Sequence, residues 1–263
     1  MDLGLNGKRA FIGGSSRGLG YAAARILAEE GCHVVLNGRD KTKLEQAAAK
    51  INQGTSGKAS LIAGDAADPN QPERLIKESV EILGGLDLLI TNTGGPPAGK
   101  FDSFDEETWQ RAINLAFMSH VRLINEALPH LKESNFASVL TVTSYSVKQP
   151  IPNLVLSNSI RSATVGLTKS LALELGPDGI RFNSILPGWT KTERVTEILQ
   201  HRADLNGSSI DEEILKITGE SPLGRMATPD EFGRAAAFLL SPAASYITGV
   251  MLTVAGGMYK GTI

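Results

Sequence analysis

A glycine-rich stretch near the N-terminus has the spacing that close contact with a phosphate group requires. It covers residues 13–20, with glycines at Gly14, Gly18 and Gly20, and lies between an apolar run and a stretch with apolar residues at helical spacing. Glycines let the backbone approach a pyrophosphate, and a helix that begins there offers free N–H groups and the positive end of its dipole. The stretch therefore predicts a dinucleotide site; the alternative is a tight turn with only a structural use.

Strand-like and helix-like stretches alternate along the rest of the chain. The apolar runs that predict strands are 9–12, 33–36, 60–62, 86–91, 138–143, 181–186 and 250–254. The stretches that predict helices are 18–30, 41–52, 71–83, 106–131, 156–175 and 229–240. This alternation predicts a single α/β domain over 1–263, with a Rossmann-like, doubly wound parallel sheet of about seven strands. Only 192–223 departs from the rhythm, and we expect it to be a substrate lid.

Composition narrows the function classes. The net charge is −2 and no run of Lys or Arg occurs, so nucleic-acid binding is not expected. No run of 18 apolar residues is present and the first residues lack a signal-peptide pattern, so we expect a cytoplasmic protein without membrane contact that acts on a small molecule. The single cysteine, Cys32, lies in an apolar stretch and predicts a buried thiol rather than a nucleophile or metal ligand, and no metal site is expected.

The end of the second predicted strand bears on the choice of cofactor. NAD-binding proteins usually place Asp or Glu there for the ribose 2′-hydroxyl, whereas this chain has Asn37 and Arg39, with Arg17 in the glycine stretch. Two planar guanidinium groups suit a 2′-phosphate, which favours NADP(H) over NAD(H). In the alternative, both arginines are solvated surface charges and Asp40 binds the ribose.

Motifs in order along nearly the whole chain resemble those of the short-chain dehydrogenase/reductase family. Beyond the glycines they are Asp65, Asn92-Thr93-Gly94, Asn114, Ser144, the stretches 166–174 and 179–183, Pro187-Gly188 with Thr192, and the glycines in 247–249 and 256–257. The resemblance implies assembly into a homodimer or homotetramer. It implies a cofactor site made of Gly14, Ser16, Arg17, Gly18, Leu19, Gly20, Asn37, Arg39, Asp65, Ala66, Asn92, Thr93, Gly94, Arg161, Pro187, Gly188, Thr190 and Thr192.

The same resemblance implies an altered catalytic centre. In the family a serine is followed thirteen residues later by tyrosine and four after that by lysine; counting from Ser144 reaches Ser157 and Arg161. Residues four apart on a helix share a face, so the side chains of Ser157 and Arg161 are both expected to point into the cleft. The resemblance also implies that Asn114 is a catalytic residue. Arginine supplies charge but does not release a proton, and serine is a poor acid or base without a neighbouring base.

Tyr145 is a second candidate source of a proton. It directly follows Ser144 at the carboxyl end of a predicted strand, where doubly wound sheets bind ligands. The run loosely resembles the divergent enoyl-thioester reductases, although the main tyrosine of that pattern falls on Leu154. Tyr145 is thus either a proton donor or substrate-orienting phenol, or a packing residue of the cleft. Of the four histidines, only His201 in the lid is placed where it could enter the cleft.

These features predict an NADP(H)-dependent oxidoreductase with an atypical active site. Its substrate would be a small to medium carbonyl or alcohol, or an activated enone, for which protonation is less demanding. The competing hypothesis is a catalytically silent nucleotide-binding homologue that acts as a sensor or a partner subunit.

Overall fold

A parallel sheet of seven strands, in the order β3-β2-β1-β4-β5-β6-β7, runs through residues 2–262, which are those that the computed structural model describes. The strands are β1 (Arg9–Ile12), β2 (His33–Gly38), β3 (Lys58–Ala63), β4 (Leu88–Thr91), β5 (Ala137–Val142), β6 (Ile180–Pro187) and β7 (Met251–Val254). Every neighbouring pair is parallel. The expected single-domain, Rossmann-like sheet is confirmed, with boundaries that differ by a few residues.

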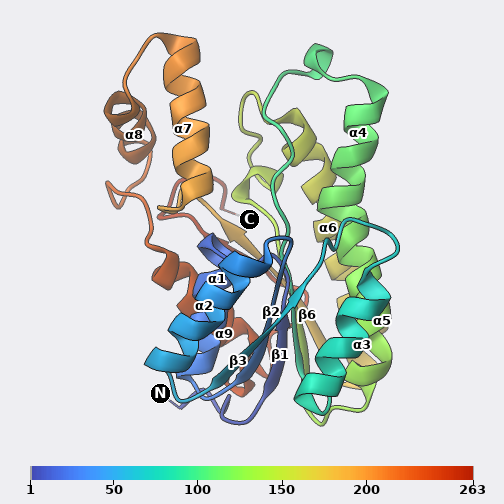
Figure 1. The fold of residues 1–263 in the computed structure, drawn as a ribbon. Coiled ribbons are helices and arrows are strands. Elements are labelled where there is room, and N and C mark those ends of the chain that lie inside the picture. The colour runs from blue at the N-terminus through green and yellow to red at the C-terminus, as the bar shows by residue number, and fades with distance from the viewer. Residues whose placement is uncertain (1, 263) are drawn as a thin grey trace.

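Helices cover both faces of the sheet (Figure 1). The structure places α1 (Gly18–Glu29), α2 (Lys41–Gly54) and α9 (Pro229–Leu240) over one face. The opposite face carries α3 (Pro72–Leu83), α5 (Ser119–Lys132) and α6 (Val155–Glu174). Since both faces are covered, the strands can be apolar on both sides, which explains their continuous apolar runs.

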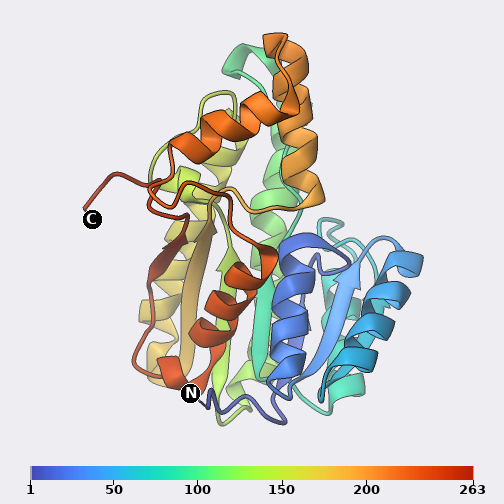
Figure 2. The ribbon, with the colours of Figure 1, turned by 90° about the vertical axis from the view of Figure 1, so that its left-hand side faces the viewer.

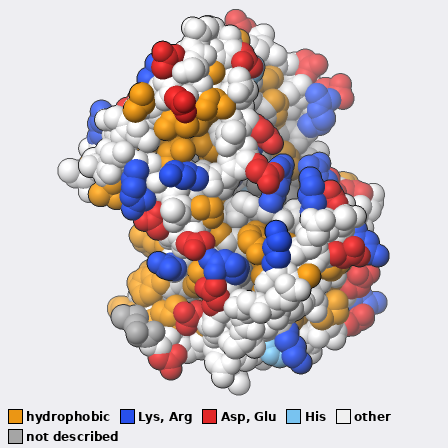
Figure 3. All heavy atoms as spheres, turned by 60° about the vertical axis from the view of Figure 1, so that its left-hand side comes forward, with side chains coloured by type: hydrophobic (Ala, Val, Ile, Leu, Met, Phe, Trp, Pro, Cys, Tyr) orange, Lys and Arg blue, Asp and Glu red, His pale blue; other side chains and the backbone are white. Residues whose placement is uncertain are grey.

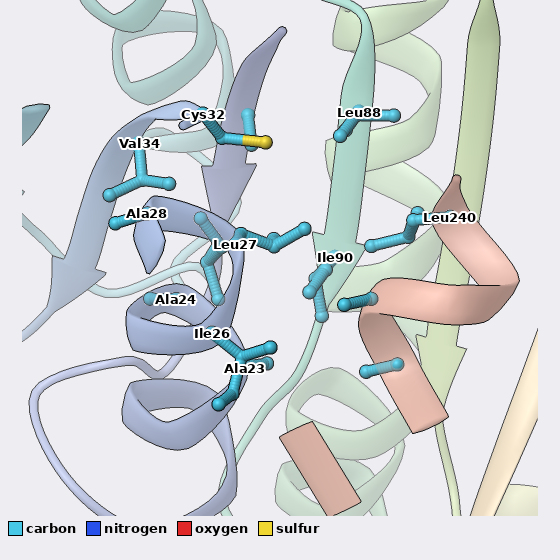
Figure 4. Close-up of a cluster of buried hydrophobic side chains, with 14 of the residues drawn as sticks. Ala23, Ala24, Ile26, Leu27, Ala28, Cys32, Val34, Leu88, Ile90 and Leu240 are labelled. Carbon is cyan, nitrogen blue, oxygen red and sulfur yellow. The ribbon is translucent and has the colours of Figure 1, made fainter. Parts of the chain in front are cut away.

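Alternate residues of each strand pack into two separate cores. Ile12 and Leu36 contact the layer of α1 and α9, whereas Phe11 and Val35, one residue earlier, point into the layer of α3 and α5. Figure 4 shows the first core, in which Leu27 of α1 and Leu240 of α9 approach Ile90 of β4. Small side chains along α1, labelled in Figure 4 as Ala23, Ala24 and Ala28, allow this helix to lie close to the sheet.

The helix expected at 106–131 is interrupted. It consists of α4 (Glu106–Ile113), a π-helical turn at Asn114–Met118, and α5. Within the turn, the carbonyl of Ala116 accepts a hydrogen bond from Thr164 of α6 at 3.0 Å, and the carbonyl of Leu115 accepts one from Ser119 at 2.6 Å. Side-chain donors therefore bind carbonyls in the turn where the regular helical ladder is lost, and π-turns of this kind are frequent at functional sites.

The segment 192–223, here the lid segment, stands above the carboxyl ends of the strands as two helices, α7 (Glu193–Asn206) and α8 (Ile210–Gly219) (Figure 2). Side-chain caps begin both: the Thr192 hydroxyl accepts from the Val195 N–H, and Ser209 forms a capping box with Glu212. The segment packs onto the body through a third apolar cluster that includes Tyr145, Trp189, Leu199 and Ile217. Its role as a substrate lid stays a prediction.

Within residues 2–262, no helix is both long and apolar enough to cross a bilayer. Acidic and basic side chains are mixed on the face that Figure 3 shows. Cys32 is fully buried, and burial raises the pKa of its thiol to about 12, so it stays protonated near neutral pH.

Candidate active site

A cleft of about 470 Å³ lies at the carboxyl ends of the central strands. Most of the residues proposed from the sequence line it: Gly14, Ser16, Arg17, Gly18, Leu19, Asn37, Arg39, Asp65, Ala66, Asn92, Thr93, Gly94, Ser144, Tyr145, Ser157, Arg161, Pro187, Gly188 and Thr192. Gly20, Asn114 and Thr190 are not among its lining residues. The sheet topology thus brings distant segments of the chain to one edge, as expected for a doubly wound fold.

The glycine loop is fixed by Asn92, which directly follows β4, and by close contacts between backbone segments. The Asn92 amide nitrogen donates to the carbonyls of Gly13 and Gly14 at 3.3 and 3.1 Å. Gly14 has a φ of 56°, and a Cβ on Gly20 would lie 2.4 Å from the Gly14 carbonyl oxygen, so neither position admits a side chain without distortion. Gly20 therefore packs directly against the backbone of Gly14. The bare backbone of this loop, at the start of α1, fits a pyrophosphate.

The part of the cleft beside the ends of β2 and β3 holds the exposed Arg39 and the carboxylate of Asp65. Asn37 is 2% exposed and its amide nitrogen donates to the carbonyls of Ile62 and Gly64, so this group braces the sheet edge. The Arg39 side chain is 80% exposed and lies 4.0 Å from Asp65, a separation too long for a hydrogen bond. One oxygen of Asp65 accepts from the N–H of Ala67. Arg39 is thus available to a ligand phosphate.

Arg161 of α6 is buried beneath the other side of the cleft. Its guanidinium donates to the carbonyls of Val142 and Thr143, at 3.1 and 3.3 Å, where β5 ends. Burial, with a smaller contribution from the charge of Arg194, lowers the pKa of Arg161 to about 10. The side chain is therefore cationic at neutral pH, and among residues 2–262 it has no carboxylate partner.

Tyr145 lies in a short 3₁₀ turn directly after β5 and is 6% exposed. Burial raises the pKa of its phenol, although a hydrogen bond from the Trp189 side chain opposes that shift. A neutral phenol that lines the cleft can donate a proton or a hydrogen bond there.

Two serine hydroxyls line the same side. The Ser144 oxygen accepts from the N–H of Ser146 at 3.2 Å. Ser157 is half-buried, and its hydroxyl has no hydrogen-bond partner among the described residues. Both lie within the cleft that Tyr145 and Arg161 also line. The structure thus brings together four of the five residues proposed for catalysis.

Asn114, the fifth, begins the π-turn outside the lining. Its side-chain oxygen accepts from Arg122 at 3.0 Å, and Arg122 also binds the carbonyl of Ala67. Thr190 is 1% exposed and pairs with Ala227 at the base of the lid segment. Both residues brace the rims of the cleft, and their proposed direct roles stay predictions.

Five residues of α7 and its approach line the cleft but were not proposed as site residues from the sequence: Trp189, Glu193, Arg194, Val195 and Ile198. Arg17 forms an ion pair with Glu193, while Arg194 donates to the carbonyl of Pro96 at 3.3 Å. Trp189 adds the indole beside Tyr145. For Glu193 and Arg194, closeness to Thr192 was the only signal in the sequence. His201 is exposed and is not among the cleft-lining residues.

Comparison with known proteins identifies the family. A family model described as enoyl-(acyl carrier protein) reductase matches residues 14–259. The cattle protein "dehydrogenase/reductase SDR family member 4" is 32% identical over 256 residues, which cover 96% of this chain and 88% of that protein. The chain belongs to the short-chain dehydrogenase/reductase family. It is accordingly an oxidoreductase of that family, as its sequence motifs predict.

Solved structures of the family superpose closely on this one. L-Sorbose reductase from Gluconobacter frateurii, complexed with NADPH and L-sorbose, gives a TM-score of 0.94 at 30% identity, with 99% of this chain and 100% of that chain covered. An NADPH-dependent reductase involved in bacilysin biosynthesis gives 0.91 at 26% identity, with 97% and 99% covered. At these TM-scores and coverages, both reductases have the fold described above over nearly the whole chain.

His120 of α5 gives the region below the cleft a measurable pH signature. It is fully buried, its Nδ1 lies 2.6 Å from the Thr91 hydroxyl, and its Nε2 has no partner among the described residues. Burial, together with the nearby charge of Arg161, lowers its pKa to about 3. In the unfolded chain a histidine titrates near its ordinary value of about 6.5.

Between those two pKa values the unfolded chain binds a proton that the folded protein does not. The free energy of unfolding is therefore expected to fall as pH drops from about 6.5 toward about 3, by up to about 1.4 kcal/mol per pH unit from this residue. His120→Asn retains a polar atom near Thr91 and should show a shallower decline in urea unfolding between about pH 6 and about pH 4.5. Equal slopes for both proteins would contradict a neutral buried His120.

Proposed function

We propose that this short-chain dehydrogenase/reductase is an NADP(H)-dependent reductase with an atypical active site, acting on a small to medium activated carbonyl or enone. The observation that carries the proposal is the cleft itself, which joins the bare glycine loop, two arginines on the nucleotide side, and the hydroxyls of Ser144, Tyr145 and Ser157. The reverse reaction, oxidation of the corresponding alcohol, uses the same groups.

The preference for NADP(H) rests on Arg17 and Arg39. Both line the nucleotide side of the cleft, and no acidic side chain ends β2 to accept a ribose hydroxyl. Two related structures of the family are complexes with NADPH, including an actinorhodin polyketide ketoreductase at 27% identity and a TM-score of 0.91. When bound, the cofactor supplies the hydride; the chain's own residues must hold the substrate and supply the proton.

Ser157 and Arg161 occupy the positions at which family members usually carry tyrosine and lysine. Arg161 cannot relay a proton at neutral pH, but its charge can stabilise an oxyanion that develops in the cleft. Ser157 can donate a hydrogen bond to the substrate oxygen without giving up its proton easily. We therefore assign proton donation to the neutral phenol of Tyr145, which burial keeps protonated.

Two further proposals concern the oligomeric state and the lid segment. A homodimer or homotetramer is expected from the family. Leu173 on α6 is 72% exposed and β7 is the edge strand of the sheet, so an apolar contact and a free edge are available to a second copy.

The lid segment is proposed to cover the substrate because the first turn of α7 lines the cleft.

Arg39→Asp tests the cofactor preference. We expect the affinity for NADPH to fall about 10- to 100-fold while that for NADH stays the same or rises, because a charge-assisted bond to the 2′-phosphate is replaced by repulsion. Dissociation constants from isothermal titration calorimetry measure both. Lys41→Asp is the matched control, since Lys41 is exposed, lies two residues away, and does not line the cleft. An unchanged NADPH-to-NADH ratio in Arg39→Asp would exclude the assignment.

Tyr145→Phe tests the proton donor. With an activated ketone as substrate, kcat is expected to fall about 100-fold or more, because general-acid assistance is lost while packing against Trp189 is kept. Ser157→Ala should cost less, about 10-fold, since only one hydrogen bond is removed. Tight NADPH binding without any turnover, unaffected by either change, would instead support the silent homologue.

Restoring the family's residues tests the placement of the centre. The double variant Ser157→Tyr/Arg161→Lys should raise ketone reduction by about 10²–10⁴-fold, because it adds a phenol of low pKa beside a cation. NADPH oxidation with a panel of ketones measures the gain. A stable double variant that binds NADPH normally but gains no activity would contradict the assigned positions of residues 157 and 161.

A further inference from the structure

The cleft divides into two sides by the order of the strands. Loops that follow β1, β2 and β3 form the nucleotide side, whereas the ends of β5 and β6, with α6 and the first turn of α7, form the other. We call this second side the substrate side. Two cations, Arg161 and Arg194, line the substrate side. The neighbour of Arg194 in the sequence, Glu193, is a carboxylate, but it is paired with Arg17 of the glycine loop.

Arg161 is a buried cation that carbonyl groups satisfy only in part. Its Nη1 donates to two backbone carbonyls, and none of its other nitrogens is bonded to a described residue. The 7% of the residue that is exposed faces the cleft that it lines. A cation removed from water without a counter-ion is costly, so an anion in the cleft would be bound favourably.

Arg194 lines the same side of the cleft from α7. It extends from the first turn of α7 to the loop after β4, where its guanidinium donates to the Pro96 carbonyl at 3.3 Å. Its other contact is with Glu197 at 3.5 Å, and that carboxylate also lies 3.8 Å from Arg17. Both partners of the Arg194–Glu197 pair are about half exposed, so the pair is weak and a ligand carboxylate can compete with it.

The two arginines are close enough to affect one another. The charge of Arg194 contributes to the lowered pKa of Arg161, as like charges that share a space must. The first turn of α7 adds the positive end of a helix dipole to the same wall. Around these charges the wall is apolar, with Ile151, Leu154, Val195 and Ile198.

We propose that Arg161 and Arg194 form a carboxylate-binding site, so that the substrate is an oxo acid or unsaturated oxo acid with an apolar body. Arg194 is the specificity-determining residue, since its half-exposed planar fork is available to bind a carboxylate, whereas Arg161 is buried and anchored on two strand-end carbonyls. The substrate class rests on the proposed reductase function, but the anion site can be measured without turnover.

The first experiment is a binding measurement with unreactive probes. We compare 3-phenylpropionate with 3-phenylpropionamide, by calorimetry, on the protein alone and with NADP⁺ present. The carboxylate is expected to bind about 10- to 100-fold more tightly than the amide, and Arg194→Gln should remove that difference. Lys191→Gln is the matched control. Lys191 lies three residues before Arg194, is exposed, and is not a lining residue of the cleft, so this variant removes the same charge outside the proposed site. Equal binding of acid and amide, or equal effects of both variants, overturns the proposal.

The second experiment uses a matched pair of activated ketones, benzoylformate and its methyl ester. The ester is intrinsically the more electrophilic, so a preference for the acid must come from binding. Arg194→Gln is expected to lower kcat/KM for the acid about 10- to 100-fold and for the ester by no more than about threefold. A merely structural role for Arg194 would lower both alike.

The two experiments separate the failure of this inference from that of the proposed function. If the carboxylate binds through Arg194 but neither ketone oxidises NADPH, the reductase fails and the anion site stands. If both ketones are reduced with no preference for the acid, the reductase stands and the anion site fails.

Discussion

The reversal of strand order between β1 and β4 is the constraint on which the site depends. From β1 the chain winds outward through β2 and β3, then returns to place β4 on the other side of β1. The loops that leave β1 and β4 therefore diverge, and a crevice opens between them. Asn92 closes its floor by binding the Gly13 and Gly14 carbonyls, and Gly13 donates to Ile90. A hydrogen-bonded floor fixes the glycine loop before any ligand arrives, so the entropy of ordering it is already met by folding.

A buried guanidinium sets the chemistry of the other end. Lysine at position 161 could gain or lose a proton within an accessible pH range, whereas Arg161 stays charged even though burial lowers its pKa to about 10. The group is anchored on two carbonyls of the strand end, which gives it a fixed direction. Fixed charge in a site of low dielectric stabilises negative charge on a substrate but moves no protons. For this reason the proposed function assigns proton donation to a separate group, the phenol of Tyr145.

Features of the site could be predicted from the sequence where the backbone itself restricts the residue type. Features that depend on contacts between distant segments of the chain could not. The glycine loop could be predicted because Gly14 needs a positive φ and Gly20 a position without a Cβ, both of which restrict residue type directly. The break at Asn114 could not, since the flanking residues have ordinary helical periodicity and the donor that binds the turn, Thr164, comes from another helix. Arg194 was missed for the same reason: a charged residue in a polar helix has no sign of function until the fold places it over the cleft. Asn37 lines the cleft as expected, but the sequence did not indicate that its amide nitrogen also binds the carbonyls at the end of β3.

The charged side chains over the cleft connect its two sides. Glu197 lies between Arg17 of the glycine loop and Arg194 of the substrate side, while Glu193 pairs with Arg17 as well. All four side chains are about half exposed or more, so each pair contributes little to stability and is screened by salt. In the proposed function, a ligand that offers anionic groups to Arg17 and Arg194 would replace these contacts with stronger, less exposed ones. In the proposed role of the lid segment, these weak contacts with the glycine loop would be the first to break, whereas the apolar cluster of Tyr145, Trp189 and Leu199 packs its base against the body of the protein.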